Sequence, residues 1–488
     1  MNKWIFFILL GMALNAGCVH KTINKDPAAK EFSTEAIQTD FDVFRTLLKK
    51  CHPSLNLYIT EKNLDHLLDS LAKQFLQKTS LGDFYNSLAA VINEIGCSHS
   101  CLFFPQQVYD TLQERSFFFP YPLELVEDKL LVNVRGYDLP QGTEIREVNG
   151  IPVKQILRSL MLYNSVEGFH RKTQQQIAGD EFSMQYYFKY GRQDNFRLRV
   201  IDTLGNEKLV DEAPVTMSEW NNRNDSKYYY DNTVVDYDLS FDEKKHYAIL
   251  RFATFDFTDI TRNNAFENFC NNSFDLIHRK GNVKHLIIDL RENHGGKLKA
   301  VFLLYSYLAK RPFREYENVT SRMGRVLYNQ YLDKSFTGEN EINRELNEEF
   351  YHSSNNNYYL YADSMNSTWQ PKPNRFTGNV YVIANRNVSS AASYFSLLVK
   401  NSGTGKIIGE ETTGGSSSGN GFQTLEYVLP NTGIRVFFPF AHLVYTNKDA
   451  QNTGHGILPD YNVPDSYESF RKNDDRQIFF ITDSLILN

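Results

Sequence analysis

The second half of the chain repeats a short apolar strand, a tight loop and a helix, and this repeat most constrains the fold. Its predicted units are a strand at 285–290, a loop at 291–296, a helix at 298–308, a strand at 381–384, a helix at 390–400 and a strand at 406–408. Strands that alternate with helices are typical of an α/β core. We therefore expect residues 233–488 to form such a core.

The pattern before this core differs. Apolar residues recur at helical spacing from Phe41 to Ile95, which predicts an N-terminal helical bundle over residues 33–105. Short β-rich segments then follow, and Asn149-Gly150 favours a hairpin turn before a helix at 154–162. This order is typical of a PDZ-like, β-rich domain, which we place at residues 115–212.

Two polar stretches interrupt these units. Residues 212–232 are predicted to be a linker, and the polar and aromatic residues 318–373 are interpreted as an insertion without clear chemistry. The 488 residues carry a net charge of −6, so no basic surface for nucleic acid is expected.

The N-terminus carries a short export-type segment. Lys3 precedes an apolar run at 4–14 that is too short to span a bilayer, and the run leads to Cys18. It resembles a bacterial lipoprotein signal, although Asn15 stands where an aliphatic residue is usual. The resemblance implies that residues 1–17 are a signal peptide and that Cys18 carries a lipid that anchors the exported protein to a membrane, on the periplasmic or cell-surface side.

Four further cysteines are Cys51, Cys97, Cys101 and Cys270. An even number in an exported protein permits disulfides without indicating a pairing. Cys97 and Cys101 flank His99, but two cysteines and one histidine without a second cluster fall short of a zinc site, so no metal is expected.

A serine pair, Ser389 and Ser390, opens the predicted helix at 390–400. Serine is a preferred N-cap, so capping is one interpretation of the pair. The other is a nucleophile, because free amides and the positive end of the helix dipole at such a turn can stabilise an oxyanion.

Four segments in the same order resemble the C-terminal processing, or tail-specific, serine peptidases and their tricorn-core relatives. They are Ile95–Ser100, Gly142–Val153, Ile288–Gly296 and Asn387–Gly415, with shorter matches at His52–Leu55 and Gly456–Asp460. The resemblance implies a multidomain α/β fold whose core is a crotonase- or Clp-protease-like spiral, and it implies serine-peptidase activity without a cofactor.

The resemblance makes Ser390 the nucleophile, rather than Ser389 or Ser393, in a register that could slip by one residue. The processing branch activates its serine with a lysine in the glycine-rich turn, where this chain has Gly415. Another base must therefore deprotonate the hydroxyl.

The tricorn-like branch uses a histidine preceded by a serine, and Ser98-His99 matches that pair. His99 becomes the base and Ser98 its link to an acid, since imidazole can accept and return a proton near neutral pH. The histidines held in reserve are His294, His442 and His455.

The resemblance places the acid just before Gly456. Asp449 is our choice there, with Asn452 or Gln451 as other occupants of the position and an ordinary loop aspartate as the other interpretation. The implied oxyanion donors are the amides of Ala391 and of Gly295 or Gly296, because glycine permits close approach to a substrate carbonyl.

These observations predict a lipid-anchored serine peptidase acting on peptides or unfolded proteins. Two alternatives stay open: a binding protein on the same core, for hydrophobic ligands or peptide chain ends, and a lipoprotein scaffold with a decayed active site.

Overall fold

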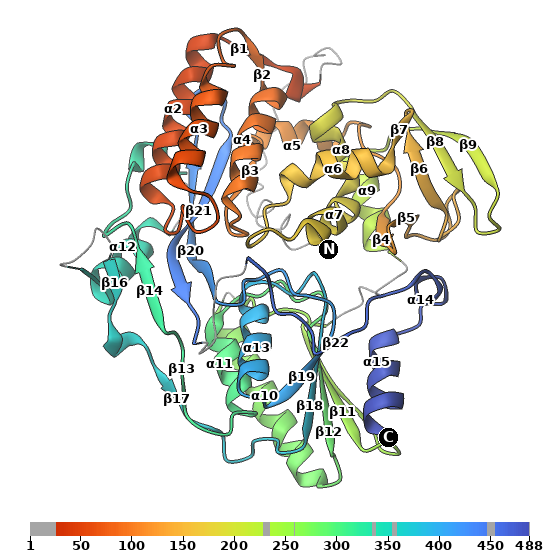
Figure 1. Cartoon of the computed structure of the whole chain (residues 1–488), viewed down its shortest axis with the longest axis vertical. Coiled ribbons are helices and arrows are strands. Elements are labelled where there is room, and N and C mark those ends of the chain that lie inside the picture. Colours follow the sequence, from red (N-terminus) through yellow and green to blue (C-terminus); the bar gives the residue numbers. More distant parts are fainter. Residues whose placement is uncertain are drawn as a thin grey trace.

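The computed structural model describes residues 26–227, 235–257, 259–333, 338–353, 359–446 and 454–487. They form a mixed α/β molecule with several sheets (Figure 1). Within these ranges no helix combines the length and the apolar character needed to cross a membrane. Cys18, the predicted lipid site, lies outside the described residues.

A six-stranded sheet organises the C-terminal half. Its strands are β10 (Tyr237–Asp242), β11 (Tyr247–Phe252), β12 (His285–Asp289), β18 (Asn379–Ala384), β19 (Gly405–Gly409) and β22 (Tyr461–Asn462), in that spatial order. β10 runs antiparallel to β11, and every other neighbouring pair is parallel. The predicted strands at 285–290, 381–384 and 406–408 are therefore confirmed.

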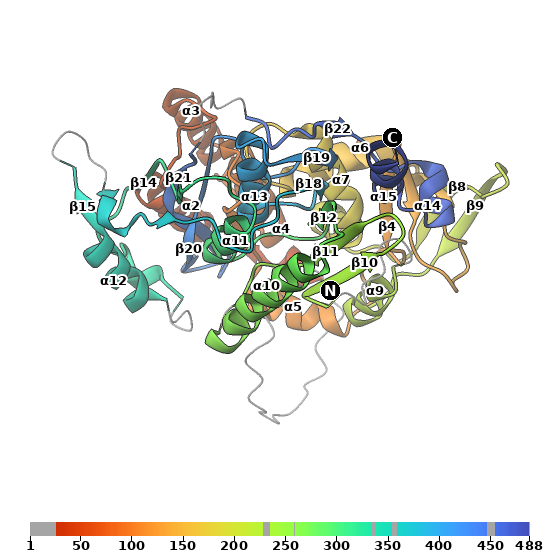
Figure 2. The ribbon, with the colours of Figure 1, turned by 90° about the horizontal axis from the view of Figure 1, so that it is seen from below.

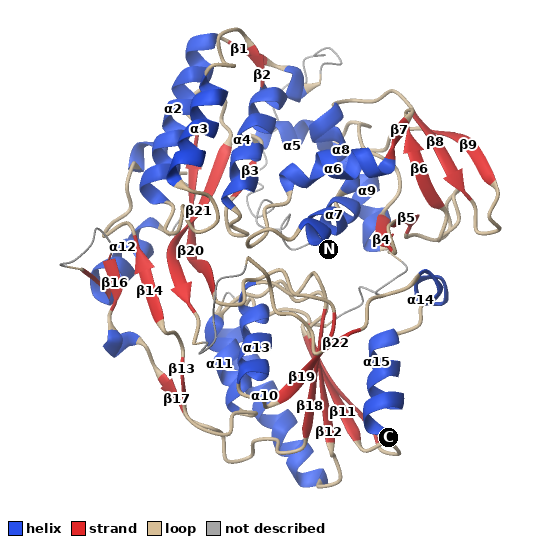
Figure 3. Cartoon of the chain, viewed as in Figure 1, coloured by secondary structure: helices blue, strands red, loops and turns tan. Residues whose placement is uncertain are grey.

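Helices cover both faces of this sheet (Figure 3). They are α10 (Ile260–Lys280), α11 (Leu298–Ser306) and α13 (Ser390–Asn401) on one face, and α15 (Arg476–Phe480) with the π-helical η5 (Ile481–Ile486) on the other. Successive side chains of β12 point to opposite faces of the sheet. Leu286 and Ile288 belong to the core on the side of α10, α11 and α13. Ile287 packs with Ile481 on the other side. A strand buried on both faces explains the continuous apolar run at 286–288.

A second sheet stands above α13. Its strands are β15 (Phe350–His352), β16 (Tyr359–Tyr361), β14 (Asn318–Ser321), β21 (Arg435–Val444) and β20 (Ser418–Val428) in spatial order, and β3 (Cys101–Phe103) pairs with β21. Smaller elements of the same region are β13 (Phe313–Arg314), β17 (Thr368–Trp369), α12 (Glu339–Glu349) and the turns η3 (Asn329–Tyr331) and η4 (Asp363–Met365). The stretch 318–373 thus supplies three strands to this sheet.

The N-terminal helices pack against this second sheet. They are α2 (Thr34–Cys51), α3 (Glu61–Ala72), α4 (Leu81–Ile95) and α5 (Gln106–Gln113), with η1 (Pro27–Ala29), β1 (Glu31–Phe32) and β2 (Thr79–Ser80) between and before them. Ser33, Thr60 and Ser80 each cap a helix start with the side-chain oxygen. The helical prediction for 41–95 is confirmed.

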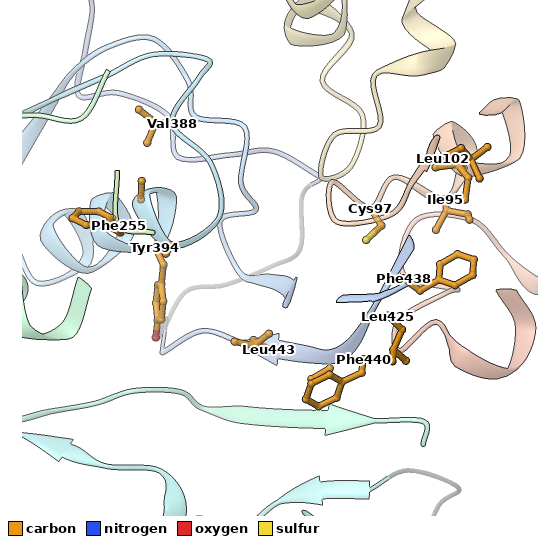
Figure 4. Close-up of a cluster of buried hydrophobic side chains, with 14 of the residues drawn as sticks. Ile95, Cys97, Leu102, Phe255, Val388, Tyr394, Leu425, Phe438, Phe440 and Leu443 are labelled. Atoms are coloured by element: carbon orange, nitrogen blue, oxygen red, sulfur yellow. The ribbon is translucent and has the colours of Figure 1, made fainter. Parts of the chain in front are cut away.

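One hydrophobic core joins these helices to the α/β part. Figure 4 follows it from Tyr394 on α13, through Leu443 on β21, to Cys97 and Leu102 beside the end of α4. Because these side chains belong to one buried cluster, the N-terminal helices and the C-terminal half share a single packed interior.

Residues 123–225 form a β-rich unit whose strands share a core of their own, whereas Trp220 near its end belongs to the large core. Its elements are β4 (Leu123–Val126), β5 (Lys129–Val132), β6 (Glu144–Val148), β7 (Ile151–Pro152), α6 (Val153–Leu160), η2 (Met161–Tyr163), α7 (Arg171–Asp180), α8 (Phe182–Tyr190), β8 (Phe196–Ile201), β9 (Glu207–Glu212) and α9 (Met217–Asp225). Asn149 and Gly150 have φ values of 52° and 78°, as the predicted hairpin turn between β6 and β7 requires. The PDZ-like assignment of this unit, and the crotonase-like assignment of the core, stay predictions.

The stretch 212–232, predicted to be a linker, is structured over much of its length. α9 begins with a capping box in which Thr216 and Glu219 bond to each other's backbone amides, and it buries Trp220. The segment was predicted to be a linker because α9 is mostly polar, although its one tryptophan, Trp220, is buried. The strands β8 and β9 of this unit lie at the opposite end of the molecule from α12 and β15 (Figure 2). α14 (Tyr467–Lys472) packs against it, since Phe470 is buried with Leu131.

Asp40 on α2 fixes the turn between β20 and β21. Its buried carboxylate accepts hydrogen bonds from the amides of Asn431 and Thr432, at 3.0 and 2.7 Å, and from the Thr432 hydroxyl at 2.6 Å. These bonds attach the N-terminal helices to the hairpin that β3 also joins.

We expect Asp40→Ala to lower the free energy of unfolding by about 2–4 kcal/mol, because buried donors would lose their charged acceptor. Urea unfolding followed by circular dichroism measures the change. Asp42→Ala, on the exposed side of the same helix, is the control and should change stability by less than about 0.5 kcal/mol. Equal losses for the two variants would contradict the role given to Asp40.

Candidate active site

Ser390 lies at the start of α13, immediately after the loop that leaves β18. Its φ of 48° is in the left-handed region, which costs a residue other than glycine about 1–3 kcal/mol unless its surroundings hold it there. Strained backbone of this kind is concentrated at functional sites. The geometry therefore singles out Ser390 within the serine-rich stretch.

The neighbouring serines are engaged in other contacts. The Ser389 hydroxyl donates to the carbonyl oxygen of His294 at 3.0 Å, and it makes no capping bond to the helix. The buried Ser393 hydroxyl donates to the carbonyl oxygen of Val388 at 2.9 Å. Side-chain capping by Ser389 is thus not observed, and of these three serines it is Ser390 that contacts the candidate base.

His99 meets Ser390 across 291 residues of sequence: its Nε2 lies 3.1 Å from Ser390 Oγ. The chain reaches this point after α4 ends at Gly96, whose φ of 67° turns the backbone, and before β3 begins. Burial in the cavity wall lowers the pKa of His99 from 6.5 to about 4. The imidazole is therefore neutral at physiological pH, as a general base must be.

The other ring nitrogen of His99 continues the chain of contacts. His99 Nδ1 lies 3.2 Å from Ser98 Oγ, and Ser98 Oγ donates to Glu167 Oε2 at 3.2 Å. Tyr58 donates its hydroxyl to the other carboxylate oxygen at 3.4 Å. Ser390, His99, Ser98 and Glu167 thus form one continuous hydrogen-bonded series.

Glu167 is the functional residue that sequence reasoning missed. It precedes α7 in the β-rich unit, is 1% exposed, and has its pKa raised from 4.5 to about 7 by burial. No periodicity or spacing marks it in the sequence. A single acidic residue in the segment Ser165-Val166-Glu167-Gly168 was the available signal, and only the fold brings it to His99.

The residues predicted at the acid position lie outside the described residues: Asp449, Gln451 and Asn452. Two of the reserve histidines have other partners. His442 Nδ1 lies 3.1 Å from Asn420 Oδ1, and His455 Nδ1 lies 3.2 Å from Glu411 Oε1.

Gly295 packs directly against the Ser390 turn. With a φ of 96°, it lies so close that a Cβ atom there would stand 2.8 Å from Ser390 Cβ and 2.9 Å from the nitrogen of Ala391. Its own amide donates to Asn293 Oδ1 at 2.9 Å. The buried Asn293 also accepts from the Ser389 amide, so this side chain and its backbone join the two loops.

The amides available to an oxyanion are those of Ala391 and Gly296. Ala391 is in the first turn of α13, where amides have no partner within the helix. Gly296 lines the same cavity as Ser390. Because the Gly295 amide is bound to Asn293, Gly296 is the better of the two glycines predicted for this role.

Position 415, where the sequence resemblance predicts the lysine of the processing branch, has no room for a side chain here. A Cβ on Gly415 would lie 2.3 Å from the carbonyl oxygen of Ser418 and 3.0 Å from Glu167 Cγ. The space beside the serine is thus taken by the strand β20 and by the acid of the histidine series.

A cavity of about 900 Å³ opens onto Ser390 and His99. Aromatic residues from several elements form part of its wall: Tyr85, Tyr163, Tyr316, Phe422 and Tyr445. Its size and its mixed lining suit an extended segment of a larger molecule.

All four described cysteines, Cys51, Cys97, Cys101 and Cys270, are unpaired. Cys97 Sγ accepts from Asn420 Nδ2 at 3.1 Å, and burial raises the pKa of both Cys97 and Cys101 to about 12. These thiols are protonated and pack as small apolar groups.

Comparison with known proteins bears on the family and on the fold. Residues 246–463 match the model of peptidase family S41. The structure of mature CPAF complexed with lactacystin is 15% identical with a TM-score of 0.62, over 93% of this chain and 97% of that one. A serine-to-alanine mutant of CPAF has a TM-score of 0.65 at 15% identity, over 93% and 96% of the two chains. No curated protein matches significantly. At this identity the structural likeness concerns the fold.

Proposed function

We propose that the chain is an exported serine-type peptidase that hydrolyses peptide bonds of peptides or unfolded proteins. The observation that carries the proposal is the 3.1 Å contact between His99 Nε2 and Ser390 Oγ, which continues through Ser98 to Glu167. The match of residues 246–463 to a peptidase family supports it, because that segment includes Ser390.

In the first half of the reaction, Ser390 Oγ attacks the carbonyl carbon and its proton passes to His99 Nε2. The amides of Ala391 and Gly296 hold the oxyanion of the tetrahedral intermediate. When the intermediate collapses, the C–N bond breaks and the amine leaves with the proton from His99. The acyl group remains esterified to Ser390.

In the second half, water attacks the ester and gives its proton to His99, which returns it to Ser390 Oγ as the acid product leaves. His99 carries a positive charge in both tetrahedral stages. Its Nδ1–H then donates to Ser98 Oγ, and the Ser98 hydroxyl donates to Glu167, whose negative charge stabilises the imidazolium through the intervening serine.

The nucleophile is tested with a serine-directed fluorophosphonate. We expect it to label the wild-type chain on Ser390, and Ser390→Ala to lose the label together with at least about a thousandfold in hydrolysis of unstructured peptides. Ser389→Ala is the matched control and should keep most of both, since its hydroxyl is bound to the His294 carbonyl.

Label that persists in Ser390→Ala would contradict the assignment. If the wild type neither reacts nor cleaves, and a hydrophobic ligand or a peptide end still binds in Ser390→Ala, the chain is a binding protein whose aromatic-walled cavity serves as the ligand site.

The role of Glu167 is tested by Glu167→Gln, which at pH 8 should lower the activity and raise the stability. Above pH 7 the wild-type carboxylate is ionised and supports the imidazolium, so we expect kcat/KM at pH 8 to fall at least about tenfold in the variant. The rise of wild-type kcat/KM through pH 7 should disappear as well.

Stability should change in the other direction. Because folding raises the pKa of Glu167 from 4.5 to about 7, its contribution to stability is present at low pH and is lost as the pH rises through 7. Glutamine does not ionise, so between pH 5 and pH 8 the variant should gain on the order of 2 kcal/mol relative to wild type in urea unfolding. Glu61→Gln, on the exposed start of α3, is the control. A variant that loses stability at pH 8 as well as activity would point to a structural role alone.

We further propose that Cys18 carries the lipid that anchors the protein. An alkyne-bearing fatty acid supplied to a bacterial host should label the wild type and bring it to the membrane fraction, and Cys18→Ser should lose both. Asn15→Leu, which restores the usual aliphatic residue, should raise the labelled fraction. Equal labelling of wild type and Cys18→Ser would rule out the anchor.

A further inference from the structure

A second cluster of titratable side chains lies apart from the serine series. His170 Nδ1 is 3.1 Å and His455 Nδ1 is 3.2 Å from the same oxygen, Glu411 Oε1. One ligand atom from each of the three residues lies within 4.8 Å of the other two. The two imidazole rings meet edge to face, with their centroids 5.2 Å apart.

These donors and distances suit one class of ion. Two imidazole nitrogens and one carboxylate oxygen are ligands that Zn²⁺ favours, whereas Ca²⁺ and Mg²⁺ take oxygen ligands. Bonds of about 2.0–2.2 Å in a tetrahedral site separate neighbouring ligand atoms by roughly 3.3 Å. The two nitrogen–oxygen separations at Glu411 already have that length.

Two of the three residues are already fixed: the backbone holds Glu411, and Glu411 holds the buried His170 ring. The Gly456 amide donates to Glu411 Oε1 at 2.9 Å and fixes the carboxylate. The His170 side chain is 1% exposed, and among the described residues its Nε2 has no hydrogen-bond partner, so the ring is held on its polar side by Glu411 alone. His455 is 55% exposed and leaves one side of the cluster open to solvent.

The three ligands come from three separate segments of the fold. His170 precedes α7, Glu411 follows β19, and His455 follows the hairpin of β20 and β21. Backbone bonds already bring these segments together: the Phe169 amide donates to the Gly454 carbonyl at 3.2 Å, and the Ser416 amide donates to the His455 carbonyl at 3.1 Å.

We propose that His170, Glu411 and His455 form a Zn²⁺ site with three protein ligands and a fourth position open to solvent. The ion would lock the loop that carries Glu167, three residues before His170, to the loop that leads from Glu411 to Gly415. Zn²⁺ binding at this site does not require that the chain be a peptidase. Only the influence of the ion on catalysis, through Glu167, rests on the proposed function. The site differs from the group Cys97, His99 and Cys101.

The binding test uses the full chain as Ser390→Ala, stripped with a chelator, so that hydrolysis plays no part. Titration calorimetry with Zn²⁺ should give one ion per chain with a Kd of about 1 μM or tighter, since three protein ligands are in place. His455→Ala removes the exposed ligand with little risk to folding and should weaken binding about a hundredfold or more. Glu411→Gln should do the same.

Two controls locate the ion. His278→Ala removes an exposed histidine on α10, and His99→Ala removes the histidine beside Ser390; both should leave the affinity unchanged. No binding, or full binding in His455→Ala, overturns the proposal. Binding that is lost in His99→Ala instead overturns it too, because the ion then lies at the serine.

A second readout tests the clamp itself. Zn²⁺ at a hundredfold excess over Kd should raise the Tm of the Ser390→Ala chain by about 3–6 °C and slow amide exchange at residues 167–170, and neither change should occur in His455→Ala. Zn²⁺ bound with no change in exchange at those residues would overturn the clamp. A chain that binds Zn²⁺ at this cluster but never cleaves peptides would retain the site and lose only the peptidase proposal.

Discussion

The contact between His99 and Ser390 depends on the pairing of β3 with β21. Cys101, two residues after His99, lies opposite Phe437 in that pair, so the sheet fixes the position of the histidine more tightly than the end of a helix could. The same β21 runs back toward α13, where Leu443 and Tyr394 share the buried core. A displacement of β21 would therefore move His99 relative to Ser390, and the core that resists this displacement also maintains the contact between them.

The helix that follows Glu167 is held by a different interface. Arg386, in the loop between β18 and α13, forms buried ion pairs with Glu124 on β4 and Asp180 on α7. Buried ion pairs contribute little net stability because each charge loses its hydration, but breaking one is costly. Such pairs favour a single arrangement of the two surfaces. Asp180 ends α7 and Glu167 precedes the same helix, so the Arg386 ion pairs anchor the helix that follows Glu167 to the loop before α13.

Local patterns were sufficient to predict much of the fold and only part of the site. The apolar runs at 285–290 and 381–384 and the helical spacing of 41–95 depend on near neighbours, and these elements form as predicted. α9 was missed because one buried tryptophan, Trp220, anchors an otherwise polar helix. Glu167 was missed because its partner Ser98 lies 69 residues away in another unit, and no local pattern records that contact.

The serine between His99 and Glu167 has a physical consequence of its own. A carboxylate bonded directly to an imidazole raises the pKa of that ring strongly. Here Ser98 lies between the two groups, and burial lowers the pKa of His99 to about 4 while it raises the pKa of Glu167 to about 7. Near pH 7 the resting pair is then a neutral imidazole and a partly ionised carboxyl, and in the proposed reaction His99 becomes charged only when Ser390 gives up its proton. The intervening serine also lengthens the reach of the series, which allows the acid to come from a separate part of the fold. The loop of Glu167 leads to His170, so a ligand bound at His170 would act on Glu167 without touching Ser390.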